Sequence, residues 1–107
     1  MIYEIRTYEP HDGKANALVQ RFRDHTLRLF PGHGIEILGL FSPVAANGQI
    51  VYLTRFVDDA ARQTAWAAFG ADPEWQRIKA ATERDGPLLR QQTVSVMTAL
   101  PAGLLLG

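Results

Sequence analysis

The chain has 107 residues, enough for one hydrophobic core, so we expect a single domain over residues 1–107. Hydrophobic residues make up 47% and charged residues 21%, a balance too apolar for an intrinsically disordered protein. Eleven basic and eleven acidic residues give a formal net charge of zero, which argues against nucleic-acid binding, and the lack of cysteine excludes disulfides and thiolate chemistry.

The first part of the chain predicts a strand followed by a helix. Residues 2–8 are rich in aromatic and β-branched side chains and contain no Gly or Pro, a composition typical of a strand. From Gly13 to about Phe30, apolar residues recur every three or four positions, which predicts an amphipathic helix that ends at Pro31-Gly32. Its apolar stripe consists of Ala15, Leu18, Val19, Phe22, Thr26, Leu29 and Phe30.

Two further strands and a hairpin connection follow this helix. Residues 35–41 and 49–57 are again rich in β-branched and aromatic side chains. Residues 42–48, which include Pro43 and the Asn47-Gly48 pair, form the predicted connection between them.

The second half of the chain predicts two helices and a last strand. Either Asp58 or Asp59 can cap the first of these helices, and Gly70 ends it. Asp72-Pro73-Glu74 starts the next helix, and residues 93–99 form the fourth strand. The order β-α-β-β-α-(α)-β predicts an α+β ferredoxin-like sandwich with a four-stranded antiparallel sheet.

Both faces of this predicted sheet are apolar. In the second strand, Ile35, Ile37 and Phe41 share one face, whereas Leu38 and Leu40 share the other. The helices can cover only one face, and a large exposed apolar face usually marks an interface. We therefore expect a homodimer in which the two sheets pack face to face. The alternative is that the alternation is blurred in such short strands.

Several segments resemble the NIPSNAP family domain. They are Ile2-Tyr3-Glu4-Ile5-Arg6-Thr7-Tyr8 with Gly13-Lys14, His33-Gly34, Gly39-Leu40-Phe41, Asp72-Pro73-Glu74-Trp75-Gln76 and Leu100-Pro101. The resemblance extends over residues 2–101 and implies a dimeric α/β barrel, in which two ferredoxin-like sheets face each other. It provides no settled catalytic residue that could be carried over. The mitochondrial and vesicle-traffic roles of animal members are not carried over to this single short domain.

The first strand also provides the main candidate ligand-binding residues. If Tyr3 and Ile5 face the helices, then Glu4, Arg6 and Tyr8 point into the space between the two sheets. Tyr52, Thr54 and Phe56 of the third strand would line the same space. Such a set can orient a small apolar or anionic ligand. The alternative is that Glu4 and Arg6 only neutralise each other, since buried charges need partners.

Histidine is a further candidate for chemistry. His25 lies at the margin of the first helix's apolar stripe, where it can reach the cavity mouth and act as a general base. Its alternative is a structural role at a helix end. His33 adjoins glycines and is expected to belong to a turn. His11, His25 and His33 show no metal-ligand spacing, so we expect neither a metal nor another cofactor.

These observations leave the biochemical role open between two classes. The first is a small-molecule-binding or interaction module, because no complete catalytic set is visible. The second is a cofactor-independent monooxygenase or isomerase acting on an aromatic or quinone-like molecule, so the sequence does not decide whether the chain is an enzyme. The chain has no secretory signal, and its apolar run Leu104–Leu106 is too short to span a bilayer. We therefore expect a cytoplasmic protein without membrane insertion, unless a leader has been removed.

Overall fold

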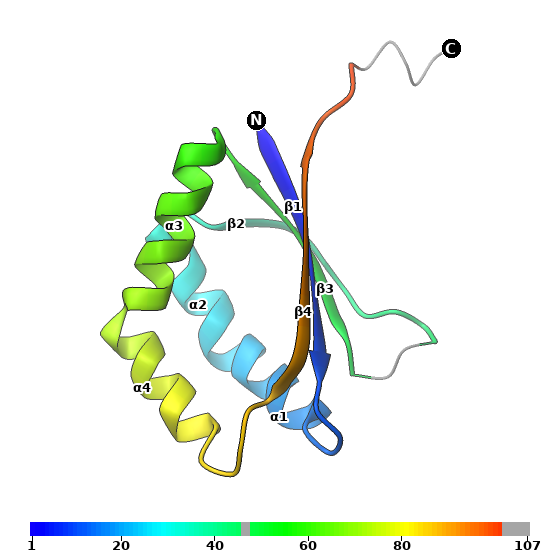
Figure 1. The fold of residues 1–107 in the computed structure, drawn as a ribbon, viewed down its shortest axis with the longest axis vertical. Helices are drawn as coiled ribbons and strands as arrows, with labels where there is room; N and C mark the ends of the chain where they lie inside the picture. Colours follow the sequence, from blue (N-terminus) through cyan, green and yellow to red (C-terminus); the bar gives the residue numbers. More distant parts are fainter. Residues whose placement is uncertain (46–47, 102–107) are drawn as a thin grey trace.

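A four-stranded antiparallel sheet with helices on one face forms the fold in the computed structural model, which describes residues 1–45 and 48–101 (Figure 1). The strands are β1 (Ile2–Pro10), β2 (Glu36–Phe41), β3 (Ile50–Phe56) and β4 (Leu89–Thr98), in the spatial order β2-β3-β1-β4. The α-helices are α1 (Ala15–Arg21), α2 (Leu27–Leu29), α3 (Asp59–Ala71) and α4 (Pro73–Thr82). This arrangement confirms the predicted α+β order of elements.

The first helical row is not one uniform helix. A π-helical turn, η1 (Phe22–Thr26), separates α1 from α2, and a 3₁₀ turn, η2 (Phe30–His33), follows α2. The α-helix itself ends at Leu29, in agreement with the predicted end at about Phe30. The helical row does not stop at Pro31-Gly32, however, because proline is tolerated in the first turn of a helical segment. The row ends instead at Gly34, whose φ of 76° is the left-handed conformation that glycine adopts without strain.

The second helical row begins and restarts where the sequence predicts. The Asp58 carboxylate accepts a hydrogen bond from the Ala61 backbone N–H at 2.8 Å and caps α3. The Asp72 carboxylate accepts one from the Glu74 N–H at 2.8 Å and caps α4, with Pro73 at its first position. These contacts confirm both predicted helix starts.

One irregularity in β2 corrects the predicted faces of that strand. The register with β3 shifts between Ile37 and Gly39, so Leu40 lies opposite Tyr52 and Phe41 lies opposite Val51. The extra residue reverses the alternation of side chains. Phe41 therefore does not share a face with Ile37, contrary to the prediction.

The fourth strand differs from the prediction in where it begins. β4 begins at Leu89, four residues before the predicted start at 93, and pairs with β1 as far as its last residues. Asn47 of the predicted turn and the run Leu104–Leu106 lie outside the described residues. Within the described part of the chain, no helix is long and apolar enough to cross a membrane.

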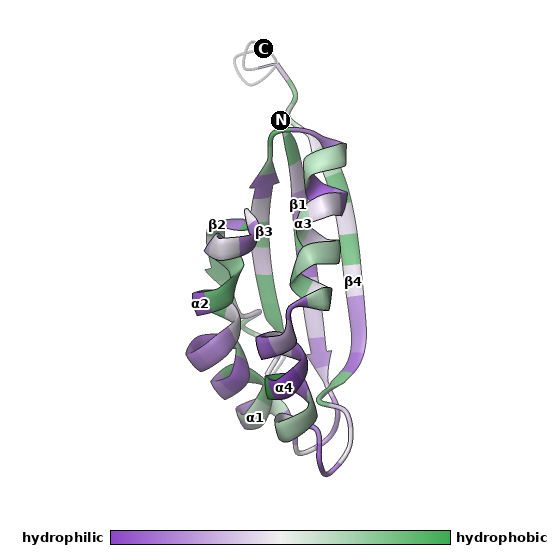
Figure 2. Cartoon of the chain, turned by 90° about the vertical axis from the view of Figure 1, so that its left-hand side faces the viewer, coloured by the Kyte–Doolittle hydropathy of each residue, from purple (hydrophilic) through white to green (hydrophobic). Residues whose placement is uncertain are grey.

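The hydrophobic core lies between the sheet and the helices. Figure 2 shows hydrophilic residues prevailing along α2 and α4, and more apolar residues along α3. The largest fully buried apolar side chains are Tyr52, Phe30, Leu18, Ile35 and Leu88. Leu18 and Phe30 belong to the predicted apolar stripe of the first helix. The core therefore joins both ends of the first helical row to the sheet.

The other face of the sheet carries no helix in the residues that the structure describes (Figure 1). Ile5 lies at its centre, opposite Leu53 on one side and Ser95 on the other, and remains 38% exposed. Val51 and Phe41 are paired nearby, and Phe41 is 60% exposed. We call this surface the open face; its apolar centre is the surface that the dimer prediction concerns.

Candidate functional site

The candidate residues of β1 face the helices, not the open face. Glu4 and Arg6 are buried, and their side chains contact residues of α3. Ile5, which was expected to face the helices, lies on the open face instead. The predicted orientation of Glu4, Arg6 and Tyr8, and with it that of Tyr52 and Thr54, is therefore wrong: these side chains lie between the sheet and the helices.

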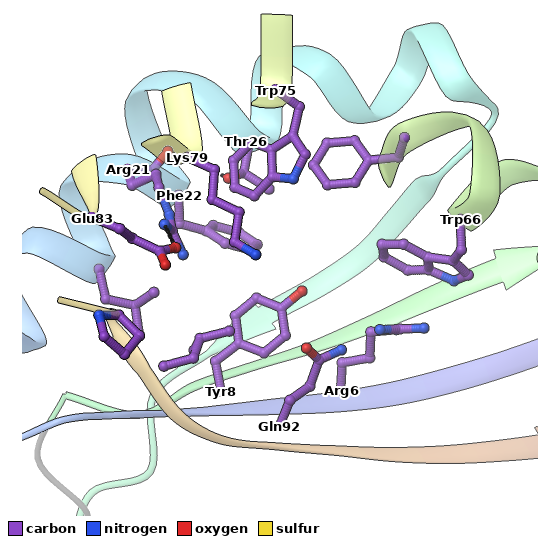
Figure 3. Close-up of a pocket in the computed structure, with 14 residues that line it drawn as sticks. Arg6, Tyr8, Arg21, Phe22, Thr26, Trp66, Trp75, Lys79, Glu83 and Gln92 are labelled. Carbon is purple, nitrogen blue, oxygen red and sulfur yellow. Dashed lines mark hydrogen bonds and ion pairs between the residues drawn. The ribbon is translucent and has the colours of Figure 1, made fainter. Parts of the chain in front are cut away.

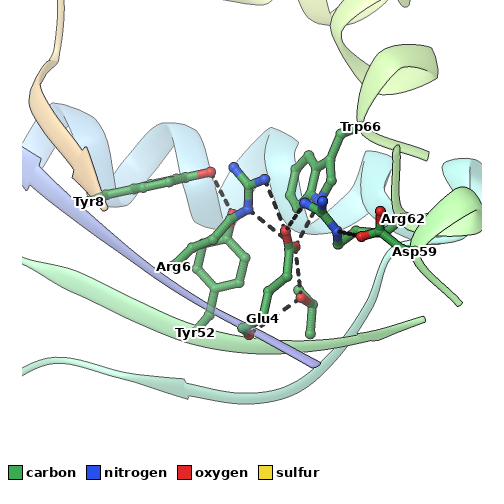
Figure 4. Close-up of polar contacts among 8 residues, drawn as sticks. Glu4, Arg6, Tyr8, Tyr52, Asp59, Arg62 and Trp66 are labelled. Atoms are coloured by element: carbon green, nitrogen blue, oxygen red, sulfur yellow. Dashed lines mark hydrogen bonds and ion pairs between the residues drawn. The ribbon is translucent and has the colours of Figure 1, made fainter. Parts of the chain in front are cut away.

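The Glu4 carboxylate is the centre of a buried polar network (Figure 4). Arg6 donates to both of its oxygens at 3.3 Å, and Arg62 donates to Oε2 at 3.0 Å. The Trp66 indole N–H and the Thr54 hydroxyl donate to Oε1 at 2.8 and 3.1 Å. Burial by itself would raise the pKa of Glu4, but these donors, Arg6 foremost, outweigh it and lower that pKa. Glu4 is therefore ionised and has no free lone pair for proton abstraction.

Helix α3 places Arg62 and Trp66 over this carboxylate. The two residues are four positions apart, so both point from one face of the helix toward the sheet. The Arg6 guanidinium lies 3.7 Å from the centre of the Trp66 ring, a cation–π contact. Arg6 is thus held between a carboxylate and an indole, and its charge is compensated on the side of Glu4.

Tyr8 and Tyr52 form a second polar contact beside this network. Their hydroxyl oxygens are 2.5 Å apart, and Tyr52 is completely buried. Burial raises the pKa of Tyr8, and it raises the pKa of Tyr52 far above its ordinary value of 10.0. Both phenols therefore keep their protons at neutral pH.

A cavity of about 410 Å³ opens above Tyr8 and Arg6, between the β1–β4 side of the sheet and the helices (Figure 3). Its side chains come from β1, α1, η1, α3, α4, β4 and the connection before β4. They are Arg6, Tyr8, Leu18, Arg21, Phe22, Thr26, Trp66, Phe69, Trp75, Lys79, Glu83, Pro87, Leu89 and Gln92. Leu18, Phe22 and Thr26 at its base are buried, whereas Lys79 and Gln92 are exposed and form its mouth. We call this space the sheet–helix cavity.

Two contacts shape the end of the cavity near α1. The Arg21 guanidinium donates to the Glu83 carboxylate at 2.6 Å and joins the end of α1 to the end of α4. The π-helical turn presents both Phe22 and Thr26 to the cavity. Such turns occur frequently at functional sites.

Histidine does not join this site. His25 borders a separate depression with Asp24 and Thr82, so the expectation that it reaches the mouth of the cavity that Arg6 and Tyr8 line is wrong. The His33 ring nitrogen Nε2 lies 2.7 Å from the Asp72 carboxylate, in keeping with the turn role expected for it. No group of three His, Cys, Asp or Glu side chains that could hold a metal ion occurs among the described residues.

Of the 14 side chains that line the cavity, the sequence interpretation named only Arg6 and Tyr8 as candidates. The missed side chains with polar or aromatic groups at the cavity include Trp66, Trp75, Lys79 and Gln92. They come from two helices and an edge strand, and only the packing of these elements brings them together. One signal was available, since the four-residue spacing of Arg62 and Trp66 predicts that both lie on one helix face.

Comparisons with known proteins give one family match and several solved structures with a similar fold. A family model described as NIPSNAP matches residues 3–102. The crystal structure of Atu4242 from Agrobacterium tumefaciens is similar, with a TM-score of 0.79 and 27% identity over 95% of this chain and 96% of that one. A NIPSNAP domain protein from Burkholderia xenovorans gives a TM-score of 0.80 and 20% identity over 95% and 97%. An antibiotic biosynthesis monooxygenase shares the fold, with a TM-score of 0.66 and 19% identity over 94% and 100%. No curated protein sequence matches the chain.

Proposed function

This chain belongs to the NIPSNAP family, and we propose on this basis that it is a homodimeric protein that binds a small molecule in the sheet–helix cavity. The observation that supports the proposal is the cavity itself, about 410 Å³ in volume. Ligand sites are typically concave and mostly apolar, with a few placed polar groups. Here Trp66, Trp75 and Phe22 supply the apolar walls, and Tyr8 and Lys79 supply polar groups.

The open face supports the dimer. Ile5, Leu53, Val51 and Phe41 form an apolar surface that a single chain leaves in water. A two-fold axis would place this surface against itself, which is the self-complementary contact of a homodimer. Sedimentation as a dimer at micromolar concentration is expected, and a monomer would contradict this part of the proposal.

Binding is favoured over catalysis because the carboxylates and imidazoles near the cavity are already engaged or lie elsewhere. Glu4 accepts five hydrogen bonds, Glu83 pairs with Arg21, and His25 borders another depression. The alternative, a cofactor-independent monooxygenase or isomerase, needs a group that takes a proton from its substrate. The monooxygenase neighbour supports that alternative through its fold alone.

The two tryptophans of the chain allow a direct test, because both line the cavity. Their indole N–H signals in a ¹H–¹⁵N NMR spectrum should shift when 2-naphthoate or 2-naphthalenemethanol is added. Gln92 lies at the cavity mouth, whereas its neighbour Gln91 points to the other face of β4. Gln92→Phe should therefore weaken binding, and the matched variant Gln91→Phe should not. Unchanged indole signals with both probes would refute the proposal.

A further inference from the structure

The Tyr8–Tyr52 contact has a direction that the burial of Tyr52 determines. The Tyr52 side chain is 0% exposed, and its hydroxyl has one hydrogen-bond partner among the described residues, the Tyr8 oxygen. If Tyr8 donated this bond, the Tyr52 proton would be buried without an acceptor, which is unfavourable. If Tyr52 donates, its proton is satisfied. Tyr52 is therefore the donor and Tyr8 the acceptor.

The proton of Tyr8 is consequently free to point into the sheet–helix cavity. Tyr8 lines this cavity and Tyr52 does not. A group inside the cavity that meets Tyr8 thus meets a hydrogen-bond donor.

Positive charge prevails around the same space. Arg6, Arg21 and Lys79 line the cavity, against one carboxylate, Glu83, although the whole chain is formally neutral. Glu83 pairs with Arg21, and Glu4 behind the wall pairs with Arg6. Lys79 has no ion pair within residues 1–45 and 48–101, and Figure 3 shows its ammonium group in the same space as the Tyr8 hydroxyl.

We propose that the ligand of this cavity is a planar aromatic molecule with an anionic oxygen, which accepts the Tyr8 hydrogen bond and faces the Lys79 ammonium. The proposal rests on the proposed function and names its ligand class. The ring lies against the aromatic walls that Trp66 and Trp75 provide. Arg6 adds positive potential at the same end, because its guanidinium lines the cavity beside Tyr8. A hydrogen bond to a charged oxygen is stronger than one to a neutral oxygen, so the charge of the ligand decides its affinity.

The test compares two probes with the same ring, 2-naphthoate and the neutral 2-naphthalenemethanol, by calorimetry on the full chain at pH 7. 2-Naphthoate should bind at least tenfold more tightly. Tyr8→Phe and Lys79→Met should each weaken it about tenfold, the effect of losing one charge-assisted contact. Lys79→Met should leave the neutral probe within about twofold. Tyr8→Phe should weaken the neutral probe less than it weakens 2-naphthoate, because an alcohol oxygen accepts only a neutral hydrogen bond. Tyr3→Phe and Lys14→Met are matched controls, since Tyr3 and Lys14 do not line the cavity.

The possible results separate the two proposals. Equal affinity for both probes, with no effect of Tyr8→Phe or Lys79→Met, would overturn the ligand class but leave the cavity as a binding site. No binding of either probe would overturn both proposals. Thermal unfolding by circular dichroism verifies that each variant is folded; if Tyr8→Phe is not, Lys79→Met at the exposed mouth decides the outcome alone.

Discussion

Replacing Glu4 by glutamine tests whether the buried network stabilises the fold. The substitution keeps the shape of the side chain but removes the charge and turns one acceptor into a donor. Arg6, whose side chain is 11% exposed, then loses its carboxylate, and Arg62 faces an amide. Removing one partner of a buried ion pair costs about 3–5 kcal/mol. Because a domain of this size has about 5–15 kcal/mol in total, Glu4→Gln should lose at least about a fifth of its stability.

Urea unfolding measured across pH is the suitable assay. Since the folded state lowers the pKa of Glu4 below its ordinary value of 4.5, the stabilisation is present above about pH 4.5 and is lost as the pH falls further. The difference between the native chain and Glu4→Gln should therefore be largest at neutral pH and shrink in acid.

The control is Glu36→Gln, which removes an exposed carboxylate that pairs with Arg55 at 2.7 Å. Its urea midpoint should stay nearly unchanged, because exposed ion pairs contribute little. A loss below about 1 kcal/mol for Glu4→Gln, the level of an exposed pair, would refute the reasoning. A difference that does not change with pH would do the same.

Three further substitutions test other contacts. Trp66→Phe removes the N–H that donates to Glu4 at 2.8 Å and should lower the free energy of unfolding by about 1–3 kcal/mol, measured in urea. Asp72→Ala removes both the cap of α4 and the carboxylate that pairs with His33. Asp58→Ala removes only the cap of α3, so Asp72→Ala should lower the melting temperature further. Equal losses would contradict the role of the histidine pair. Ile5→Lys puts a charge at the centre of the open face and should yield a folded monomer in sedimentation experiments; a persistent dimer would exclude this face as the interface.

The order of the elements could be predicted because local signals agree with the fold. Asp58 and Asp72 precede helices with suitable caps, and the strands differ from the helices in the period of their apolar residues. The end of the first helical row was less predictable, since Pro31 is compatible with both a stop and a 3₁₀ turn.

The orientation of β1 could not be read from its own residues. Ile5 is the more apolar side chain, so burial against the helices seemed the better choice for it than for Glu4 and Arg6. The structure shows the reverse, because residues about sixty positions away stabilise the buried charges. Arg62 and Trp66 donate hydrogen bonds to Glu4, and the Trp66 ring contacts Arg6. The same distance in sequence explains why the composition of the cavity was only partly foreseen.

The π-helical turn has a consequence for the length of the first helical row. Leu18, Phe22, Thr26 and Phe30 are each four residues apart, and all four are buried. In a regular α-helix, each four-residue step advances the side chain by about 40°, so three steps would rotate Phe30 well away from Leu18. A π turn holds more residues than an α turn and offsets this drift. Deleting one residue within Phe22–Thr26 would restore a regular α-helix but rotate the residues that follow about the helix axis. Phe30 would then leave the core, and the melting temperature should fall. The number of residues between Leu18 and Phe30 is therefore matched to the π-helical turn, and a change of one residue would disturb the packing of this row.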